Sequence, residues 1–354
     1  MKLWKKIILS ALGILLLLSI IYIKEVVFLV SFFSDQISLI NKSENLQTAI
    51  NDTQIPPEIR QQLTIVTKIM AFGDHLGFPE TKAYSSYIQL PRDVFLHSLT
   101  ASKKDSFEEY FWYWPFVGKL PYKGFINKEN ALQEQAELKK LYYDTDLGES
   151  SAMSTLGYLD EPIITTMINK NDPTVLVNTI FHERTHQLFF RQNDITFNEN
   201  AATMIGAISA LNFIKQEFDE NSTEYQRQTQ RVHDHIIFSQ FINEFYQDLT
   251  NLYQSPLSSE QKIQQRELIF GEYKEKFKTL KEKQLQHYFL KFDQQEINNA
   301  YILSYYRYYG RLFVYYQVYD KFNQDVSKTI QFFNQIATGN EDPETAINTF
   351  LAQS

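Results

Sequence analysis

The sequence predicts a predominantly α-helical α+β protein with a small mixed or antiparallel sheet and an N-terminal transmembrane helix. Three observations support this fold class. Proline and glycine are sparse, with 10 and 11 among 354 residues, which favours long helices over turn-rich β architecture. A hydrophobic content of 44% is ample for a packed core in one large domain or two modest ones. Short β-rich runs are confined to one region, and helical spacing of apolar residues dominates elsewhere.

The first element is an apolar segment that follows three lysines. Lys2, Lys5 and Lys6 precede an uncharged run of 17 residues, Ile7–Ile23, which is close to the lower limit for a bilayer span. The run ends in bulky residues and no small-x-small cleavage site follows it, so we expect an uncleaved signal anchor. A cleaved signal peptide and a merely buried helix are the alternatives. The positive-inside rule keeps the lysines in the cytoplasm and places the rest of the chain outside it.

The next segments are expected to be helical. Val26–Phe33 is too short to return across the membrane and should continue the first helix, which gives a membrane anchor at residues 1–33 and one domain at residues 34–354. Gln36–Phe72 predicts two helices with a stop near Ile55. The second helix should begin at Pro56–Glu58, because proline in a first turn loses no needed hydrogen-bond donor.

A small sheet is expected between Ala83 and Asp146, where short β-rich runs replace the helical pattern. A polar helical segment, Lys128–Lys140, interrupts these runs, and Ser154–Tyr158 is one more strand candidate. The runs are AYSSYIQL from residue 83, DVFLHSLTA from residue 93, EYFWYWPFVGKL from residue 109 and KGFI from residue 123.

The chain after residue 171 is expected to be almost wholly helical. Asp172 is a suitable N-cap and Pro173 suits a first helical position, which predicts a helix at Asp172–Arg191. A polar turn at Gln192–Asp194 should lead into a second helix at Phe197–Phe218. Two short helices should end the chain, after helices at Ser222–Gln254, Ser259–Gln286 and Glu296–Phe322. The domain thus has a helical start and small sheet at residues 34–171 and a helical part at residues 172–354.

Charge and cysteine content exclude several classes of function. The net charge of -8 is spread along the chain with no basic block beyond the N-terminal tip, so we expect no nucleic-acid partner. The absence of cysteine excludes disulfides, thiolate metal ligands and cysteine nucleophiles. Histidines and carboxylates are therefore the ligands available to a metal.

An H-E-x-x-H motif, His182 to His186, lies within the helix expected at 172–191. Residues four apart share a helical face, so both imidazoles can approach a single Zn²⁺, while Glu183, rotated by about 100°, can hold a water beside the metal. Zinc lowers the pKa of such a water to about 7, and Glu183 is the expected general base as the water attacks a carbonyl. A chance match is the alternative. Ionisable side chains on a capped, apolar helix argue against chance, because burying them is costly unless they are paired or metallated.

Glu199, 13 residues after His186, is the expected third ligand. Small residues on its face of the second helix, Ala202 and Gly206 among them, would allow the two helices to approach closely. A carboxylate satisfying the helix dipole is the alternative role for Glu199. Asp194 competes as third ligand, but its position in the turn favours a helix cap. The remaining histidines are interpreted as surface or packing residues: His75, His97, His233, His235 and His287.

Together these motifs resemble the bacterial putative aminopeptidase family, a group of secreted or lipid-anchored H-E-x-x-H proteins related to gluzincins. The resemblance extends over most of the chain. The segments that carry it are 34–39, 83–87, 115–118, 122–125, 154–158, 160–162, 180–183, 197–199 and 298–300.

The resemblance implies a zincin-like catalytic core in which His182, His186 and Glu199 bind one zinc ion and Glu183 is the base. It also implies that Ser154–Leu159 is an edge strand that aligns the substrate backbone. With the anchor, it predicts a single-pass protein of the bacterial inner membrane whose catalytic domain faces the periplasm.

Two features depart from the family pattern. Many relatives carry a lipobox cysteine, which this chain lacks, so its anchor should be the helix itself. Arg184 stands where relatives tend to have an apolar residue. We expect its side chain to point to solvent or to pair with a carboxylate.

The expected function is hydrolysis of peptide or protein substrates by a membrane-anchored zinc aminopeptidase. An aminopeptidase must hold the substrate's free ammonium, for which Asp160 and Glu161 are candidates, although an acidic turn before Pro162 explains them equally well. Tyr308, within the tyrosine-rich run 305–309, is the expected donor to the tetrahedral intermediate. An endopeptidase is one alternative. A non-catalytic zinc-binding envelope scaffold or chaperone is another, although a structural zinc normally has four protein ligands and only three candidates are found.

Overall fold

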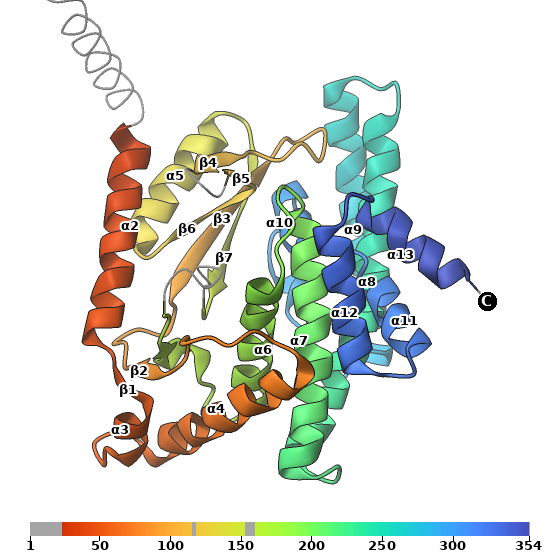
Figure 1. Cartoon of the computed structure of the whole chain (residues 1–354). Coiled ribbons are helices and arrows are strands. Elements are labelled where there is room, and N and C mark those ends of the chain that lie inside the picture. Colours follow the sequence, from red (N-terminus) through yellow and green to blue (C-terminus); the bar gives the residue numbers. More distant parts are fainter. Residues whose placement is uncertain (1–22, 115–117, 153–159, 354) are drawn as a thin grey trace, which may run out of the picture.

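The computed structural model describes residues 23–114, 118–152 and 160–353 and confirms a predominantly helical α+β protein with small sheets (Figure 1). Its helices are α2 (Ile23–Lys42), α3 (Leu46–Asn51), α4 (Pro57–Leu76), α5 (Lys128–Lys140), α6 (Thr174–Leu188), α7 (Ile195–Phe218), α8 (Thr223–Gln254), α9 (Ser259–Lys283), α10 (Asn299–Tyr309), α11 (Leu312–Lys321), α12 (Val326–Thr338) and α13 (Pro343–Ala352). Its strands are β1 (Glu44–Asn45), β2 (Ser86–Ile88), β3 (Leu96–Ser102), β4 (Trp112–Trp114), β5 (Gly118–Leu120), β6 (Tyr122–Phe125), β7 (Asp144–Ser150) and β8 (Ile163–Ile164).

The expected transmembrane helix at Ile7–Ile23 lies, apart from its last residue, outside the described residues. Across the part of the chain that is described, no helix has the length and apolar character needed to cross a membrane. The strand expected at Ser154–Tyr158 also lies outside the described residues.

The expected single sheet is, in the described residues, three small ones. Strand β3 is the centre of an antiparallel sheet with β6 and β7, β2 pairs antiparallel with β1 and parallel with β8, and β4 and β5 form a separate hairpin. Strand β7 is not among the strands expected from the sequence, because its residues Asp-Thr-Asp-Leu-Gly-Glu-Ser have low strand propensity. This strand exists because it pairs with β3 along seven residues, which is a tertiary effect.

The residues at which helices start agree with the sequence prediction better than the lengths over which helices run unbroken. Helix α4 begins at Pro57, as the Pro56–Glu58 signal predicts. The segment 36–72, however, contains a break before α4, where Asn45 caps the short helix α3 through its side chain. The single helix expected at Glu296–Phe322 is two helices, α10 and α11.

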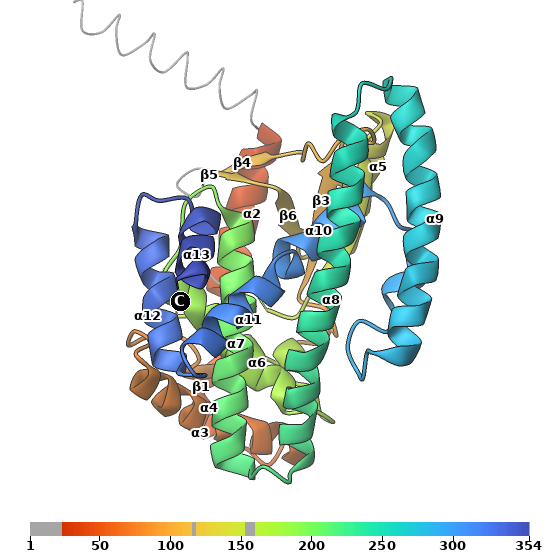
Figure 2. The ribbon, with the colours of Figure 1, turned by 90° about the vertical axis from the view of Figure 1, so that its right-hand side faces the viewer.

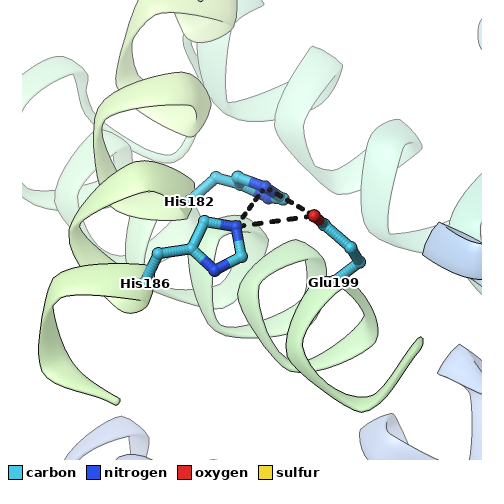
Figure 3. Close-up of side chains that lie close together, drawn as sticks. All are labelled: His182, His186 and Glu199. Atoms are coloured by element: carbon cyan, nitrogen blue, oxygen red, sulfur yellow. Dashed lines mark hydrogen bonds and ion pairs between the residues drawn. The ribbon is translucent and has the colours of Figure 1, made fainter. Parts of the chain in front are cut away.

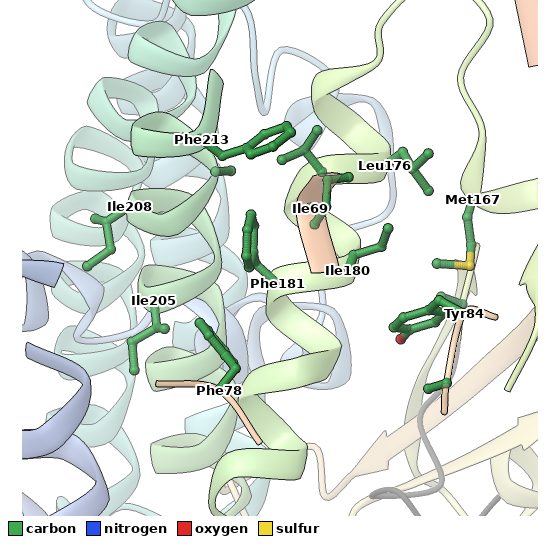
Figure 4. Packing of buried hydrophobic residues seen from close by; sticks show 14 of the residues in the cluster. Ile69, Phe78, Tyr84, Met167, Leu176, Ile180, Phe181, Ile205, Ile208 and Phe213 are labelled. Carbon is green, nitrogen blue, oxygen red and sulfur yellow. The ribbon is translucent and has the colours of Figure 1, made fainter. Parts of the chain in front are cut away.

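The sheet of β6, β3 and β7 lies between α5 on one side and the C-terminal helices on the other, and α8 and α9 form a long hairpin (Figures 1 and 2). One hydrophobic core joins residues from Leu46 to Ile347. At its centre, the ring of Phe181 on α6 lies between those of Phe78 and Phe213, at centroid distances of 5.8 and 6.3 Å (Figure 4). The helix that carries the H-E-x-x-H motif is therefore buried in the core on one face.

Candidate metal and catalytic site

Helix α6 presents the H-E-x-x-H residues on the face opposite its core contacts. The helix starts after Asp172, whose carboxylate accepts hydrogen bonds from the Thr174 amide and hydroxyl at 3.0 and 2.6 Å. Ile180 and Phe181 are fully buried and fix the rotation of the helix about its axis. His182 and His186 then project toward α7 (Figure 3).

Helix α7 supplies Glu199, and its start is determined by two side chains. Asp194 is the N-cap and accepts from the Phe197 amide at 3.1 Å, so it serves as the expected cap. The buried Asn198 side chain bonds both the amide and the carbonyl of Arg191, at 2.9 and 2.8 Å. These bonds hold the end of the α6–α7 loop against the first turn of α7, next to Glu199.

The two helices touch at Gly206. A Cβ added there would lie 3.0 Å from the backbone nitrogen and 3.1 Å from the Cα of His182. Contacts this short are closer than ordinary van der Waals contact, so a side chain here would push the two helices apart by a few tenths of an ångström. The small residue on the face of Glu199 therefore allows the close helix approach that the sequence predicts.

Three side chains from these helices converge on one point. The Nε2 atoms of His182 and His186 lie 3.2 Å apart, and Oε2 of Glu199 lies 3.3 and 3.4 Å from them (Figure 3). Within the described residues, they form the group of His, Asp and Glu side chains whose geometry could hold a metal ion. Asp194 is not part of the group.

The charges of this group are strongly coupled. Although burial opposes ionisation of Glu199, the imidazoles of His186 and His182 hold the pKa of its carboxyl well below the usual range. Burial lowers the pKa of His186, but the carboxylates of Glu199 and Glu183 outweigh this and raise it overall. Burial raises the pKa of Glu183, and the carboxylates of Glu199 and Glu161 add to the rise against the lowering by the two histidines.

The group fits a zinc ion by a simple geometric test. Tetrahedral zinc with ligand bonds of about 2.0–2.1 Å requires neighbouring ligand atoms to lie about 3.3–3.4 Å apart. The three observed separations agree with that edge length. In addition, Oε2 of Glu199 is buried without a hydrogen bond of ordinary geometry, which is costly unless the oxygen has another partner.

Tyr308 lies beside the group of three candidate ligands, and a second tyrosine, Tyr122, is close enough to feel the charge of Glu199. The Tyr308 ring lies 6.3 Å from that of His182, with 27° between their planes. Burial, followed by the charge of Glu199, raises the pKa of Tyr308 and of Tyr122 on β6. Tyr122 is not among the candidates expected from the sequence, because it stands 60 residues before the motif, in a β-rich run. The signal that could have found it is its place in the segment 122–125 that carries the family resemblance.

The two candidates for binding an ammonium group differ in burial. Asp160 is exposed, whereas Glu161 is 7% exposed, and its backbone carbonyl accepts from the Tyr84 amide at 2.7 Å. The Glu161 carboxylate is also close enough to Glu183 to raise the pKa of that residue. Glu161 is therefore the buried candidate whose charge acts on the site, and Asp160 is the exposed one.

Arg184 is fully buried, so of the two positions expected for its side chain, exposure to solvent is wrong. Pairing with a carboxylate is confirmed. Its guanidinium donates to Asp74 Oδ1 at 2.9 Å and to the carbonyls of Met70 and Pro79 at 3.0 Å each. Because Gly73 has no side chain, α4 can accept this group. Arg184 thus attaches α6 to α4 on the side away from the histidine pair.

The other histidines lie outside the metal-compatible group. His235 is buried against Tyr316, whose hydroxyl lies 3.0 Å from its Nδ1. His233 lies beside Asp234 at 3.0 Å, and His97 is buried in β3. These positions agree with packing and surface roles.

A family model described as putative aminopeptidase matches residues 27–347 of the chain. A search of the curated proteins and a search of the solved structures each found no match to this chain.

Proposed function

We propose, since the chain belongs to the putative aminopeptidase family, that it is a zinc-dependent aminopeptidase attached to a membrane by its N-terminal segment. The observation that carries the zinc assignment is the convergence of His182, His186 and Glu199 at the separations of a tetrahedral zinc site. Three ligands leave one position for water or substrate, which favours a catalytic over a structural metal. The gluzincin character and the zincin-like core are part of this proposal.

The roles of the residues follow from their charges and positions. Zinc, when bound, supplies Lewis acidity toward a carbonyl and makes a water more acidic. Glu183 accepts the proton of the attacking water and delivers it to the leaving amine. Its raised pKa suits both transfers, since this carboxylate binds a proton more readily than a carboxylate exposed to solvent does. The phenols of Tyr308 and Tyr122, kept protonated by their raised pKa values, are the donors that we assign to the developing oxyanion.

Replacing Glu183 tests the mechanism. Glu183→Gln keeps the shape of the side chain but removes the base, so we expect hydrolysis to fall by about 10²–10⁴-fold while one zinc per chain is retained. His186→Ala should instead lose the metal itself. The measurements are zinc content and the rate of peptide cleavage with and without a chelator. An active Glu183→Gln enzyme would contradict the mechanism, and zinc binding without chelator-sensitive cleavage would favour a non-catalytic scaffold.

Exopeptidase specificity is assigned to Glu161. Its buried carboxylate, on the side of Glu183, can pair with the free ammonium of a substrate. We expect peptides with a free N-terminus to be cleaved and the same peptides with an acetylated N-terminus to resist. Glu161→Gln should raise KM for free peptides, and Asp160→Asn is the matched control with an exposed side chain. Equal cleavage of free and blocked peptides would identify an endopeptidase instead.

A further inference from the structure

Asn200 follows the candidate ligand Glu199 and is fully buried. Its side-chain nitrogen donates to the carbonyl of Thr196 in its own helix at 2.8 Å and to the carbonyl of Arg307 in α10 at 2.8 Å. Its side-chain oxygen accepts from the backbone amide of Arg311 at 3.3 Å. One amide thus joins α7 to two backbone groups four residues apart.

Those two groups would bond each other in a continuous α-helix, where the amide of residue i donates to the carbonyl of residue i−4. Here the Asn200 amide is inserted between them. Gly310 donates to Tyr306 at 2.7 Å, which completes α10, and α11 begins after Arg311. A side chain inserted into the ladder is an established cause of helix kinks. Asn200 therefore occupies the break between α10 and α11.

Tyr308 lies in the last turn of α10, next to this break and directly after the residue whose carbonyl Asn200 binds. The backbone around it is tightly packed, since a Cβ at Gly310 would lie 2.6 Å from the Tyr306 carbonyl oxygen. The Tyr308 ring faces His182, while Glu199 approaches the same histidine from α7. Consecutive residues of α7 thus contact the histidine pair and the backbone beside the tyrosine.

We propose that Asn200 is a positioning residue that fixes Tyr308 relative to Glu199 by its insertion into the α10–α11 break. Its role in catalysis rests on the proposed function, because it acts through the hydrogen bond that Tyr308 donates. Without the amide, the Arg307 carbonyl and the Arg311 amide must either stay unsatisfied or bond each other. The second outcome would straighten the helix and move Tyr308.

The catalytic part of the test is a double-mutant cycle in the full-length chain. We expect Asn200→Ala to lower kcat by about tenfold to a hundredfold, the size of effect that an ångström of misplacement produces, with KM and zinc content little changed. In a Tyr308→Phe background the same substitution should change kcat by less than about twofold, because residues that act through one group are not additive. A full multiplicative effect in that background would overturn the proposal, as would an unchanged kcat in the single variant.

The matched control is Asn212→Ala. Asn212 lies about three turns after Asn200 on α7 and donates to the carbonyl four residues before it at 2.9 Å, as Asn200 does. Its other contact is the hydroxyl of Tyr319 on α11, away from the α10–α11 break. We expect Asn212→Ala to leave kcat unchanged, both in the wild-type chain and in the Tyr308→Phe background. If Asn200→Ala does not fold, Asn200→Asp has nearly the same shape and keeps the oxygen that accepts from the Arg311 amide. It loses the donor to the Thr196 and Arg307 carbonyls, so the same pattern is expected.

A second measurement does not depend on activity. Fluorotyrosine incorporated at position 308 should give one ¹⁹F resonance, which shifts or splits in Asn200→Ala and stays in place in Asn212→Ala. If the wild-type chain hydrolyses no peptide, the proposed function fails while this measurement still decides the positioning. An unshifted resonance in folded Asn200→Ala would overturn it.

Discussion

At the scale of single residues, two buried histidines behave in opposite ways because their neighbours differ. His186 lies beside carboxylates, which raise its pKa despite burial. His235, also buried, has a pKa well below the usual value, because burial acts first and the positive charges of Arg231 and His182 act in the same direction. Aromatic residues also surround it, namely Tyr316, whose hydroxyl lies 3.0 Å from its Nδ1, and the rings of Tyr309 and Phe289. We therefore expect His235 to be neutral in the folded chain and to gain a proton on unfolding below a pH of about 6.5.

This difference predicts a specific loss of stability in acid. The unfolded chain binds a proton at His235 below a pH of about 6.5 and the folded chain does not, so the free energy of unfolding should fall as the pH drops, by up to about 1.4 kcal/mol per pH unit. His235→Gln can still bond the Tyr316 hydroxyl but does not titrate. We expect its unfolding free energy, measured by denaturant titration, to decline less between pH 6.5 and 5.5 than that of the wild type. Parallel pH profiles would contradict a buried neutral His235.

At the scale of elements, the spacing of α6 and α7 determines whether the three candidate ligands can meet. Gly206→Ala places a methyl group about 3 Å from the backbone of His182, so we expect it to destabilise the fold by about 1–3 kcal/mol and to weaken zinc binding. Gly271→Ala is the control, because its added Cβ meets no atom within 4 Å and alanine is the better helix former. That change should stabilise the chain by up to about 1 kcal/mol. Equal zinc affinity in Gly206→Ala and wild type would show that the helices can separate without cost to the site.

The elements also show what could be predicted from the sequence and why the rest could not. The H-E-x-x-H spacing and the cap Asp194 are local signals, and in the structure His182 and His186 meet from one helix and Asp194 caps α7. The break between α10 and α11 has no local signal strong enough to predict it, and the side chain that bonds the backbone on both sides of it, Asn200, lies more than a hundred residues earlier. Strand β7 likewise depends on pairing with β3. Tyr122 reaches the site only through this tertiary arrangement.

At the scale of the whole molecule, the candidate site lies where the two halves of the domain meet. Helices α6, α7 and α10 bring the ligands and Tyr308, while the N-terminal half contributes Tyr122 and Glu161. Arg184 connects α6 to α4 across the same boundary. Hydrolysis should therefore require both halves.

The proposed membrane attachment should be separable from hydrolysis. The apolar run Ile7–Ile23 leads directly into α2, whose first turns expose Val27 and Val30 and whose later residue Gln36 is buried. A 20-residue helix is about 30 Å long, so α2 can connect a bilayer to the domain while the candidate site stays outside it. Leu15→Arg with Leu18→Arg should prevent the span from inserting, since each arginine costs about 2.5–3.5 kcal/mol near the bilayer centre.

We expect this double variant in the soluble fraction after alkaline extraction, with zinc content and peptidase activity unchanged, because none of the candidate site residues lies in the run. Leu15→Ala with Leu18→Ala keeps the run apolar and should remain with the membrane pellet. Two outcomes would contradict the anchor, namely a double-arginine variant that still sediments with membranes, or a wild-type protein recovered in soluble form at a mass that lacks the first residues. The second outcome would identify the run as a cleaved signal peptide, and α2 would then begin the mature chain with an exposed apolar face.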